Sequence, residues 1–150
     1  MVSVGDIAPD FSATDCAGRE FKLSDFRGKK VVLFFFPRAF TPACTIEIRA
    51  FRDNQALIES KGAVLVGVSV DNHTRQCDFA KSESIDFHLI GDEHRTISEK
   101  YGVVWPVLKI DRRATFIIDE HGLVEDVLHH EVQVYKHLDD VLVKLGAVPV

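Results

Sequence analysis

The sequence predicts an α/β fold with a mixed central sheet and helices on both of its faces. Two apolar runs, Val31–Phe36 and Ala63–Val70, have the length and composition of strands that are buried on both sides. A helical pattern follows each run. Later in the chain, the turn residues 119–122 join Thr115–Asp119 to Leu123–Leu128, which predicts an antiparallel hairpin. This β-α-β, helix, β-β-α order is typical of a three-layer sandwich.

Shorter elements complete the prediction around these strands. Asp71 or Asn72 is expected to cap a helix that continues through Ser82. The other expected elements are short strands at Ser12–Ala13, Glu20–Leu23 and His88–Ile90, a helix from Cys44 to Ser60, a short helix at Thr96–Tyr101 that ends at Gly102, and a last helix at Val134–Leu145 that ends at Gly146.

The composition agrees with a single globular domain over residues 1–150. Of the 150 residues, 46% are hydrophobic and 27% are charged, so the chain can bury a substantial core. The net charge is −5, and Arg112-Arg113 is only a pair and not part of a basic stripe. The longest apolar run is too short to span a bilayer. We therefore expect no nucleic-acid partner, no membrane association and a cytoplasmic location.

A cysteine lies in the first turn of the helix that follows the first buried strand. Pro37 ends that strand because proline has no N–H to donate to a ladder. After Pro42 the pattern becomes helical, since Ile48 and Phe51 recur four and seven residues beyond Cys44. The unpaired N–H groups and the positive end of the helix dipole favour a thiolate at this place. Taken alone, Cys44 is still most simply a small buried hydrophobic residue.

The surroundings of this cysteine resemble the active-site loop of the peroxiredoxins. Pro37, Thr41 and Cys44 form the order Pro-x-x-x-Thr-x-x-Cys on a strand-loop-helix junction. Residues 44–53 look like the segment found in the bacterioferritin comigratory protein branch, also called the Q type. The likeness covers nearly the whole chain, because residues 4–11, 23–29 and 113–119 also match family segments. It implies a thioredoxin-like sandwich.

The resemblance implies a thiol-dependent peroxidase that reduces hydrogen peroxide and organic hydroperoxides through a sulfenic acid on Cys44. By the same resemblance, the Thr41 hydroxyl and the Cys44 N–H orient the peroxide, and Pro37 shapes the pocket. Arg113 matches the family arginine that favours the thiolate and stabilises developing negative charge. Glu47 is expected to support that arginine. No metal or organic cofactor is implied, because the sulfur does the chemistry itself.

The sulfenic acid must be resolved by a second thiol. Many members of the Q-type branch carry that cysteine five residues after the nucleophile, where this chain has Arg49. Cys77 is the expected resolving cysteine, because some relatives carry theirs on the following helix, although a buried core cysteine fits the sequence comparably well. Cys16, on an N-terminal turn, is the poorer candidate. If neither cysteine resolves the sulfenic acid, the protein works by a one-cysteine route with an external thiol, as the related AhpE-like branch does.

The three cysteines are widely separated and include no Cys-x-x-Cys pair, so the sequence favours reactive or free thiols over a disulfide framework. The expected partners are a peroxide and a reductant, either thioredoxin or a low-molecular-weight thiol. The protein itself is expected to be a monomer or a homodimer. The chief alternative is a peroxide-sensing thiol switch or chaperone-like redox protein without sustained turnover. A thiol-disulfide oxidoreductase ranks lower because its paired cysteines are missing.

Overall fold

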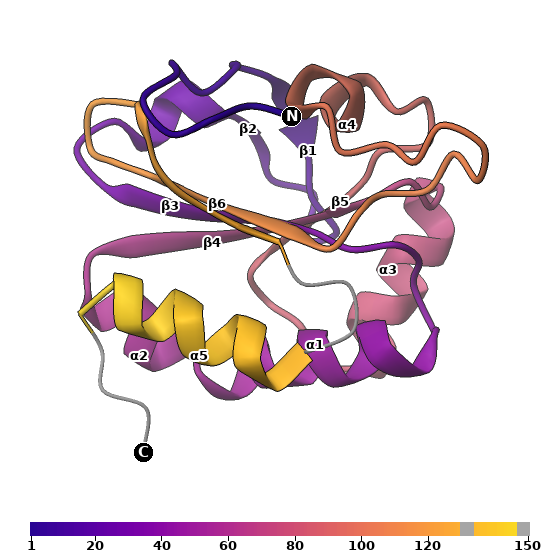
Figure 1. Ribbon diagram of the computed structural model, residues 1–150. Helices are drawn as coiled ribbons and strands as arrows, with labels where there is room; N and C mark the ends of the chain where they lie inside the picture. The colour runs from indigo at the N-terminus through magenta and orange to yellow at the C-terminus, as the bar shows by residue number, and fades with distance from the viewer. Residues whose placement is uncertain (130–133, 147–150) are drawn as a thin grey trace.

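The computed structural model describes residues 1–129 and 134–146, and a mixed sheet lies at its centre (Figure 1). Within those residues, the strand order of the main sheet is β5-β4-β3-β6-β7. β3 is parallel to β4 and β4 to β5, whereas β6 is antiparallel to β3 and β7. The bounds are β3 (Lys30–Phe35), β4 (Ala63–Ser69), β5 (His88–Gly91), β6 (Ala114–Ile118) and β7 (Val124–His129). The predicted mixed sheet is confirmed, with strand ends shifted by one residue at most.

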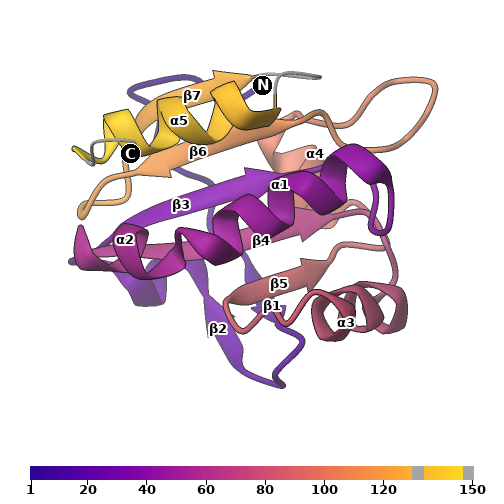
Figure 2. The ribbon, with the colours of Figure 1, turned by 90° about the horizontal axis from the view of Figure 1, so that it is seen from below.

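Helices lie on both faces of this sheet, as predicted. α1, α2 and α5 cover one face, and α4 lies on the other face with the β1-β2 hairpin (Figure 1). α3 packs beside β5 at the edge of the sheet (Figure 2). The bounds are β1 (Ser12–Thr14), β2 (Glu20–Lys22), the 3-10 helix η1 (Leu23–Phe26), α1 (Pro42–Asp53), α2 (Gln55–Ser60), α3 (His73–Ser82), α4 (Thr96–Tyr101) and α5 (Val134–Lys144). No helix in the described part of the chain is long and apolar enough to cross a membrane.

The central strand β3 contributes alternate residues to two separate cores. Val32 and Phe34 belong to the core under α1, α2 and α5, whereas Leu33 and Phe35 belong to the core on the opposite face. All four side chains are fully buried. This alternation follows from the two-residue period of a strand. The loop that follows β3 is therefore attached to a strand that both cores hold in place.

A stacked pair of phenylalanines joins β3 to α1. The ring centroids of Phe34 and Phe51 are 4.2 Å apart, with an angle of 17° between the ring planes. Complete burial of such a side chain contributes about 1.5–3 kcal/mol. Gly67 of β4 leaves room for this pair, because a Cβ at that position would lie 2.5 Å from Phe34 Cζ. The stack fixes α1, and hence its first turn, against the end of β3.

Two local features differ from the sequence prediction. The helix expected from Cys44 to Ser60 is interrupted at Asn54, where α1 ends and α2 begins. Asn54 donates a hydrogen bond from Nδ2 to the carbonyl oxygen of Ala50 at 2.9 Å, and such local side-chain bonds compete with helix continuation. Leu23, expected to end a strand, instead begins η1. The strands and helices on either side keep their predicted order.

Candidate functional site

The loop after β3 leads directly into the first turn of α1, which carries Cys44. Thr41 is the N-cap residue in extended backbone, with φ −77° and ψ 149°. Pro42 takes the first helical position, where a missing N–H leaves no hydrogen bond unmade. Cys44 is thus the third helical residue, and only 1% of its surface is exposed. Pro37 begins the loop and is half-buried.

Arg113 and Glu47 meet Cys44 in a buried cluster. Arg113 lies directly before β6, the strand beside β3, and Glu47 follows Cys44 by about one turn of α1. Arg113 donates from Nη1 to Glu47 Oε1 at 2.6 Å and from Nη2 to Cys44 Sγ at 3.5 Å. The Arg113 and Glu47 side chains are 3% and 2% exposed. The sulfur therefore faces a fixed cation in a region of low dielectric constant.

The charges in this cluster keep Arg113 ionised. Burial lowers the pKa of the guanidinium, but its charge interactions and hydrogen bonds with Glu47 and Cys44 outweigh burial and raise that pKa above the usual value. Glu47 also supplies the partner without which a buried arginine would cost several kcal/mol. This arrangement can hold a thiolate and can stabilise negative charge that develops beside the sulfur.

The neighbouring arginine makes a different contact. Arg112 Cζ lies 3.7 Å from the centroid of the Trp105 ring, in a cation-π arrangement. The sequence distinguishes Arg112 from Arg113 only by the place of Arg113 directly before residues 114–116. The structure directs Arg113 to the sulfur and Arg112 to the tryptophan.

The Thr41 hydroxyl is hydrogen-bonded within the loop. Its Oγ1 donates to the carbonyl oxygen of Arg38 at 2.8 Å. The Thr41 carbonyl oxygen accepts bonds from the N–H and the hydroxyl of Thr45, at 2.9 and 2.8 Å. A hydroxyl that donates its proton still has lone pairs with which to accept a hydrogen bond. Thr41 Oγ1 is thereby oriented as an acceptor in the loop that precedes Cys44.

Asp71 holds the loop that precedes Cys44, and the sequence did not predict this role. Asp71 Oδ2 accepts the N–H of Ala39 at 2.7 Å and the hydroxyl of Ser69 at 2.6 Å. Its Oδ1 pairs with Arg75 Nε at 3.1 Å, and Arg75 Nη2 donates to the Ala39 carbonyl oxygen at 3.3 Å. A signal was present in the sequence, because Asp71 follows β4 and the carboxyl ends of the parallel strands β3 and β4 meet at one edge.

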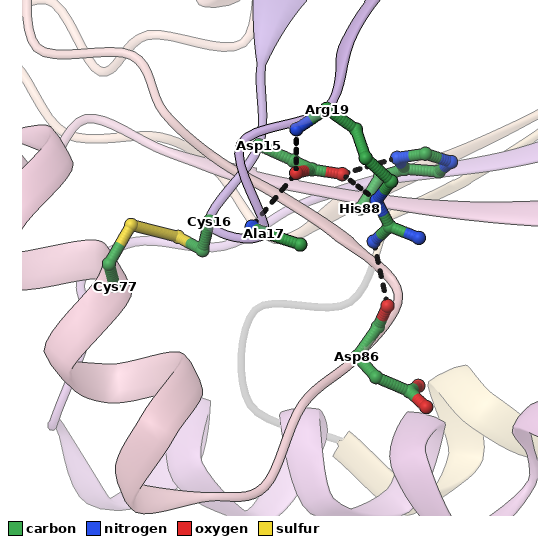
Figure 3. Close-up of polar contacts among 7 residues, drawn as sticks. All are labelled: Asp15, Cys16, Ala17, Arg19, Cys77, Asp86 and His88. Carbon is green, nitrogen blue, oxygen red and sulfur yellow. Dashed lines mark hydrogen bonds and ion pairs between the residues drawn. A yellow bond between two sulfur atoms is a disulfide. The ribbon is translucent and has the colours of Figure 1, made fainter.

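The other two cysteines form a disulfide, and Cys44 is the free cysteine of the three. Cys16 lies in the turn between β1 and β2, and Cys77 lies in α3, 61 residues later, with the two Cα atoms 5.1 Å apart (Figure 3). The expectation of free thiols at these positions is wrong for this structure. Cys77 is half-buried and joined to Cys16, so it is not a buried core cysteine. Its resolving role stays a prediction.

Sequence reasoning missed this pairing because only tertiary packing creates it. Cys16 reaches α3 because its backbone N–H donates to the carbonyl oxygen of Leu89 in β5, the strand that α3 packs against. No spacing in the sequence reports that contact. Among the described residues, no group of three or more His, Cys, Asp or Glu side chains is arranged to hold a metal ion.

Comparisons with known proteins agree on one family. A sequence profile described as the AhpC/TSA family matches residues 4–127. Peroxiredoxin Bcp of Escherichia coli K12 is 33% identical over 144 residues, which cover 87% of this chain and 92% of that protein. The chloroplastic peroxiredoxin Q of Sedum lineare is 35% identical over 142 residues, covering 94% and 76%. The crystal structure of peroxidoxin BcpB from Mycobacterium tuberculosis matches with a TM-score of 0.88 and 34% identity over all of both chains. The predicted thioredoxin-like fold is confirmed.

Proposed function

Because this chain belongs to the AhpC/TSA family and is a thiol-dependent peroxidase, we propose that Cys44 is the thiolate that attacks the peroxide. The observation that carries the proposal is the buried contact of Arg113 with both Cys44 and Glu47. Cys44 is also the free cysteine, in the first turn of a helix, where unpaired N–H groups stabilise negative charge. Hydrogen peroxide and organic hydroperoxides are the substrates.

The chemistry is a displacement at oxygen. The Cys44 thiolate forms an S–O bond while the O–O bond breaks, so the sulfur becomes a sulfenic acid. The departing oxygen takes the electron pair and then a proton, which gives water or an alcohol. Arg113, 3.5 Å from the sulfur, stabilises the charge on the departing oxygen. Thr41 Oγ1 accepts the peroxide O–H, and the Cys44 N–H donates to the peroxide.

Three residues support this reaction without receiving or donating a proton. Glu47 positions Arg113 through the 2.6 Å hydrogen bond and balances its charge. Pro37 ends β3 and sets the course of the loop that shields the sulfur. Asp71 joins this supporting set, since it binds the backbone of Ala39 within the loop.

The test adds one equivalent of hydrogen peroxide to the fully reduced protein and follows peroxide loss and intact mass. The wild type is expected to consume the peroxide within seconds, and Cys44→Ser is expected to leave it unconsumed. Equal inertness of both proteins would mean that Cys44 is a structural thiol. Repeated turnover with an added reductant distinguishes an enzyme from a sensor, because a sensor stops after one equivalent.

The reductant is a thiol, and we propose thioredoxin or a low-molecular-weight thiol in the cytoplasm. Support comes from the chemistry, because a reducing compartment supplies the thiols that each turnover consumes. Steady-state turnover with thioredoxin, thioredoxin reductase and NADPH, compared with turnover with glutathione, identifies the better donor. If neither donor supports turnover, this assignment is wrong.

A further inference from the structure

The Cys16–Cys77 disulfide is a second sulfur site that the reaction at Cys44 does not explain. The two cysteines come from separate elements, the β1-β2 turn and α3 (Figure 3). Both are half-buried, whereas Cys44 is almost completely buried. A surface groove borders the disulfide and is lined by residues that include Ala17, Asp78 and Lys81. An external thiol can therefore approach this disulfide more readily than it can approach Cys44.

The Cys16 side of the bond is held rigidly. The Cys16 N–H donates to the carbonyl oxygen of Leu89 at 3.2 Å. The preceding residue, Asp15, accepts from the N–H groups of Ala17 and Arg19 at 2.9 and 3.0 Å. Asp15 Oδ2 also lies 2.7 Å from His88 Nδ1 (Figure 3). Burial raises the pKa of Asp15, but these hydrogen bonds and the Arg19 charge outweigh it, so that pKa lies below its usual value. These hydrogen bonds hold the turn independently of the disulfide.

The Cys77 side is connected to the loop before Cys44. Arg75 and Phe79, two residues before and two residues after Cys77, both contact that loop. Arg75 Nη2 donates to the Ala39 carbonyl oxygen at 3.3 Å, and Arg75 Cζ lies 5.1 Å from the Phe40 ring centroid. The ring centroids of Phe79 and Phe40 are 5.1 Å apart. Arg75 and Phe79 lie one helical turn apart on the face of α3 that meets the loop. Cys77, midway between them, lies on the opposite face with its sulfur bound to Cys16.

From this arrangement, and resting on the proposed role of Cys44, we propose that the three cysteines form a relay that moves the oxidised state from Cys44 to the Cys16–Cys77 disulfide. The structure represents the last oxidised state of that relay, with Cys44 free and the other two sulfurs joined. Cys77 is the sulfur that attacks Cys44, and it reaches Cys44 when the turn of α3 that contacts the Cys44 loop unwinds. Cys16 stays in the turn between β1 and β2.

Each step of the relay balances. The Cys77 thiolate attacks the sulfur of the Cys44 sulfenic acid, a Cys44–Cys77 disulfide forms, and hydroxide leaves and takes a proton to become water. The Cys16 thiolate then attacks the Cys77 sulfur, the Cys44–Cys77 bond breaks, and Cys44 leaves as a thiolate. Two equivalents of an external thiol, or one dithiol, reduce the Cys16–Cys77 disulfide and are oxidised to a disulfide themselves.

The consequence is that the reductant acts at the groove beside Cys16 and Cys77 and not at Cys44. Cys44 returns to its thiolate before any external thiol arrives, so it spends little time as a sulfenic acid that a second peroxide could oxidise further. The relay also separates the surface that meets the reductant from the buried cluster that meets the peroxide.

The relay is tested by single turnover in four proteins: the wild type, Cys16→Ser, Cys77→Ser and Cys44→Ser. Each is fully reduced, mixed with one equivalent of hydrogen peroxide, blocked with N-ethylmaleimide at successive times, and mapped by mass spectrometry. A sulfenic-acid trap is added in parallel. All samples start reduced, so none has the disulfide as a stabilising link, and circular dichroism verifies that each is folded.

The relay predicts a different product in each protein. The wild type ends with Cys16–Cys77 joined and Cys44 blocked by maleimide. Cys16→Ser accumulates the Cys44–Cys77 disulfide, and Cys77→Ser stops at the Cys44 sulfenic acid. Cys44→Ser forms no disulfide over the same interval.

Other products would overturn the relay. Cys16–Cys77 formation in Cys44→Ser at the wild-type rate would mean that peroxide oxidises this pair directly. Absence of Cys44–Cys77 in folded Cys16→Ser, or a wild type that ends as a sulfenic acid, would remove the transfer steps. If Cys77→Ser shows no sulfenic acid at Cys44, the proposed function itself fails, and the relay fails with it. Because Cys77→Ser cannot transfer, it separates the two kinds of failure.

Discussion

Replacing Arg113 with methionine removes the charge that faces the sulfur and keeps a side chain of comparable length. Arg113 Nη2 lies 3.5 Å from Cys44 Sγ. At an effective dielectric constant of about 20, two unit charges at that separation interact by about 5 kcal/mol. The negative charge of Glu47, on the other side of the guanidinium, offsets part of this interaction energy. Removing one stabilising donor from a preorganised site typically costs about 2.7–4 kcal/mol. We therefore expect the rate constant for reaction with hydrogen peroxide to fall about 10²–10³-fold.

The assay is stopped-flow reaction of the reduced protein with hydrogen peroxide, and the matched control is Arg112→Met. Arg112 is the adjacent arginine, but it stacks on Trp105 and does not contact the sulfur. A substitution outside the cluster normally changes energies by no more than about 0.5 kcal/mol, so the control is expected to react within about twofold of the wild type. Equal rates in folded Arg113→Met and Arg112→Met would refute the reasoning.

Loss of stability must be kept apart from loss of rate. Arg113→Met removes the buried guanidinium that pairs with the Glu47 carboxylate, and breaking a buried ion pair typically costs about 3–5 kcal/mol of folding free energy. The double variant Glu47→Gln, Arg113→Met removes both charges and is expected to regain much of that stability without regaining the rate. A folded double variant that reacts as fast as the wild type would show that the charge at Arg113 does not drive the reaction.

Three further predictions follow from other contacts. Thr41→Val is expected to slow the reaction with peroxide about tenfold or more, because it removes one hydrogen bond to the peroxide. Thr41→Ser keeps the hydroxyl and is expected to keep most of the rate. Equal stopped-flow rates for Thr41→Val and Thr41→Ser would contradict this. Burial raises the pKa of Asp111 to about 8, with an opposing hydrogen bond from Ser98. The folded state therefore holds a proton that the unfolded state loses above about pH 4, and stability falls by up to about 1.4 kcal/mol per pH unit until about pH 8. Urea unfolding at pH 5.5 and 7.5 is expected to show this fall in the wild type and its loss in Asp111→Asn. Gly67→Ala places a Cβ 2.5 Å from Phe34 Cζ. This overpacking is expected to lower the free energy of unfolding by about 1–3 kcal/mol. An unchanged midpoint of urea unfolding would contradict the close packing.

Much of the fold was predictable because local patterns carry it. The apolar run at Val31–Phe36 predicted β3 to within one residue, since a strand with both faces buried needs a continuous apolar stretch. Asn72 was one of two predicted caps of α3, and its Oδ1 accepts the N–H of Arg75 at 2.8 Å. The break at Asn54 escaped prediction because it depends on one side chain bonding its own helix, against helical periodicity on both sides.

The site was predictable in its residues but not in its contacts. Cys44 could be placed in the first turn of a helix from periodicity, and the resemblance to a known family singled out Arg113. No pattern within the sequence predicts that Arg113 donates to Cys44 and Glu47 together, because only tertiary packing brings the start of β6 against the first turn of α1. The anchoring by Asp71 and the Cys16–Cys77 bond were missed for the same reason. Contacts between distant segments are set by tertiary packing.

The cluster of Cys44, Glu47 and Arg113 has a consequence for the life of the protein in a cell. Arg113 stands 69 residues after Cys44 and reaches it only when β6 has joined β3. A nascent chain released before that strand is made, or a chain unfolded by heat, carries Cys44 without the Arg113 guanidinium beside it. Rapid reaction with peroxide is therefore a property of correctly folded molecules, and incomplete chains are spared the oxidation that their finished counterparts undergo.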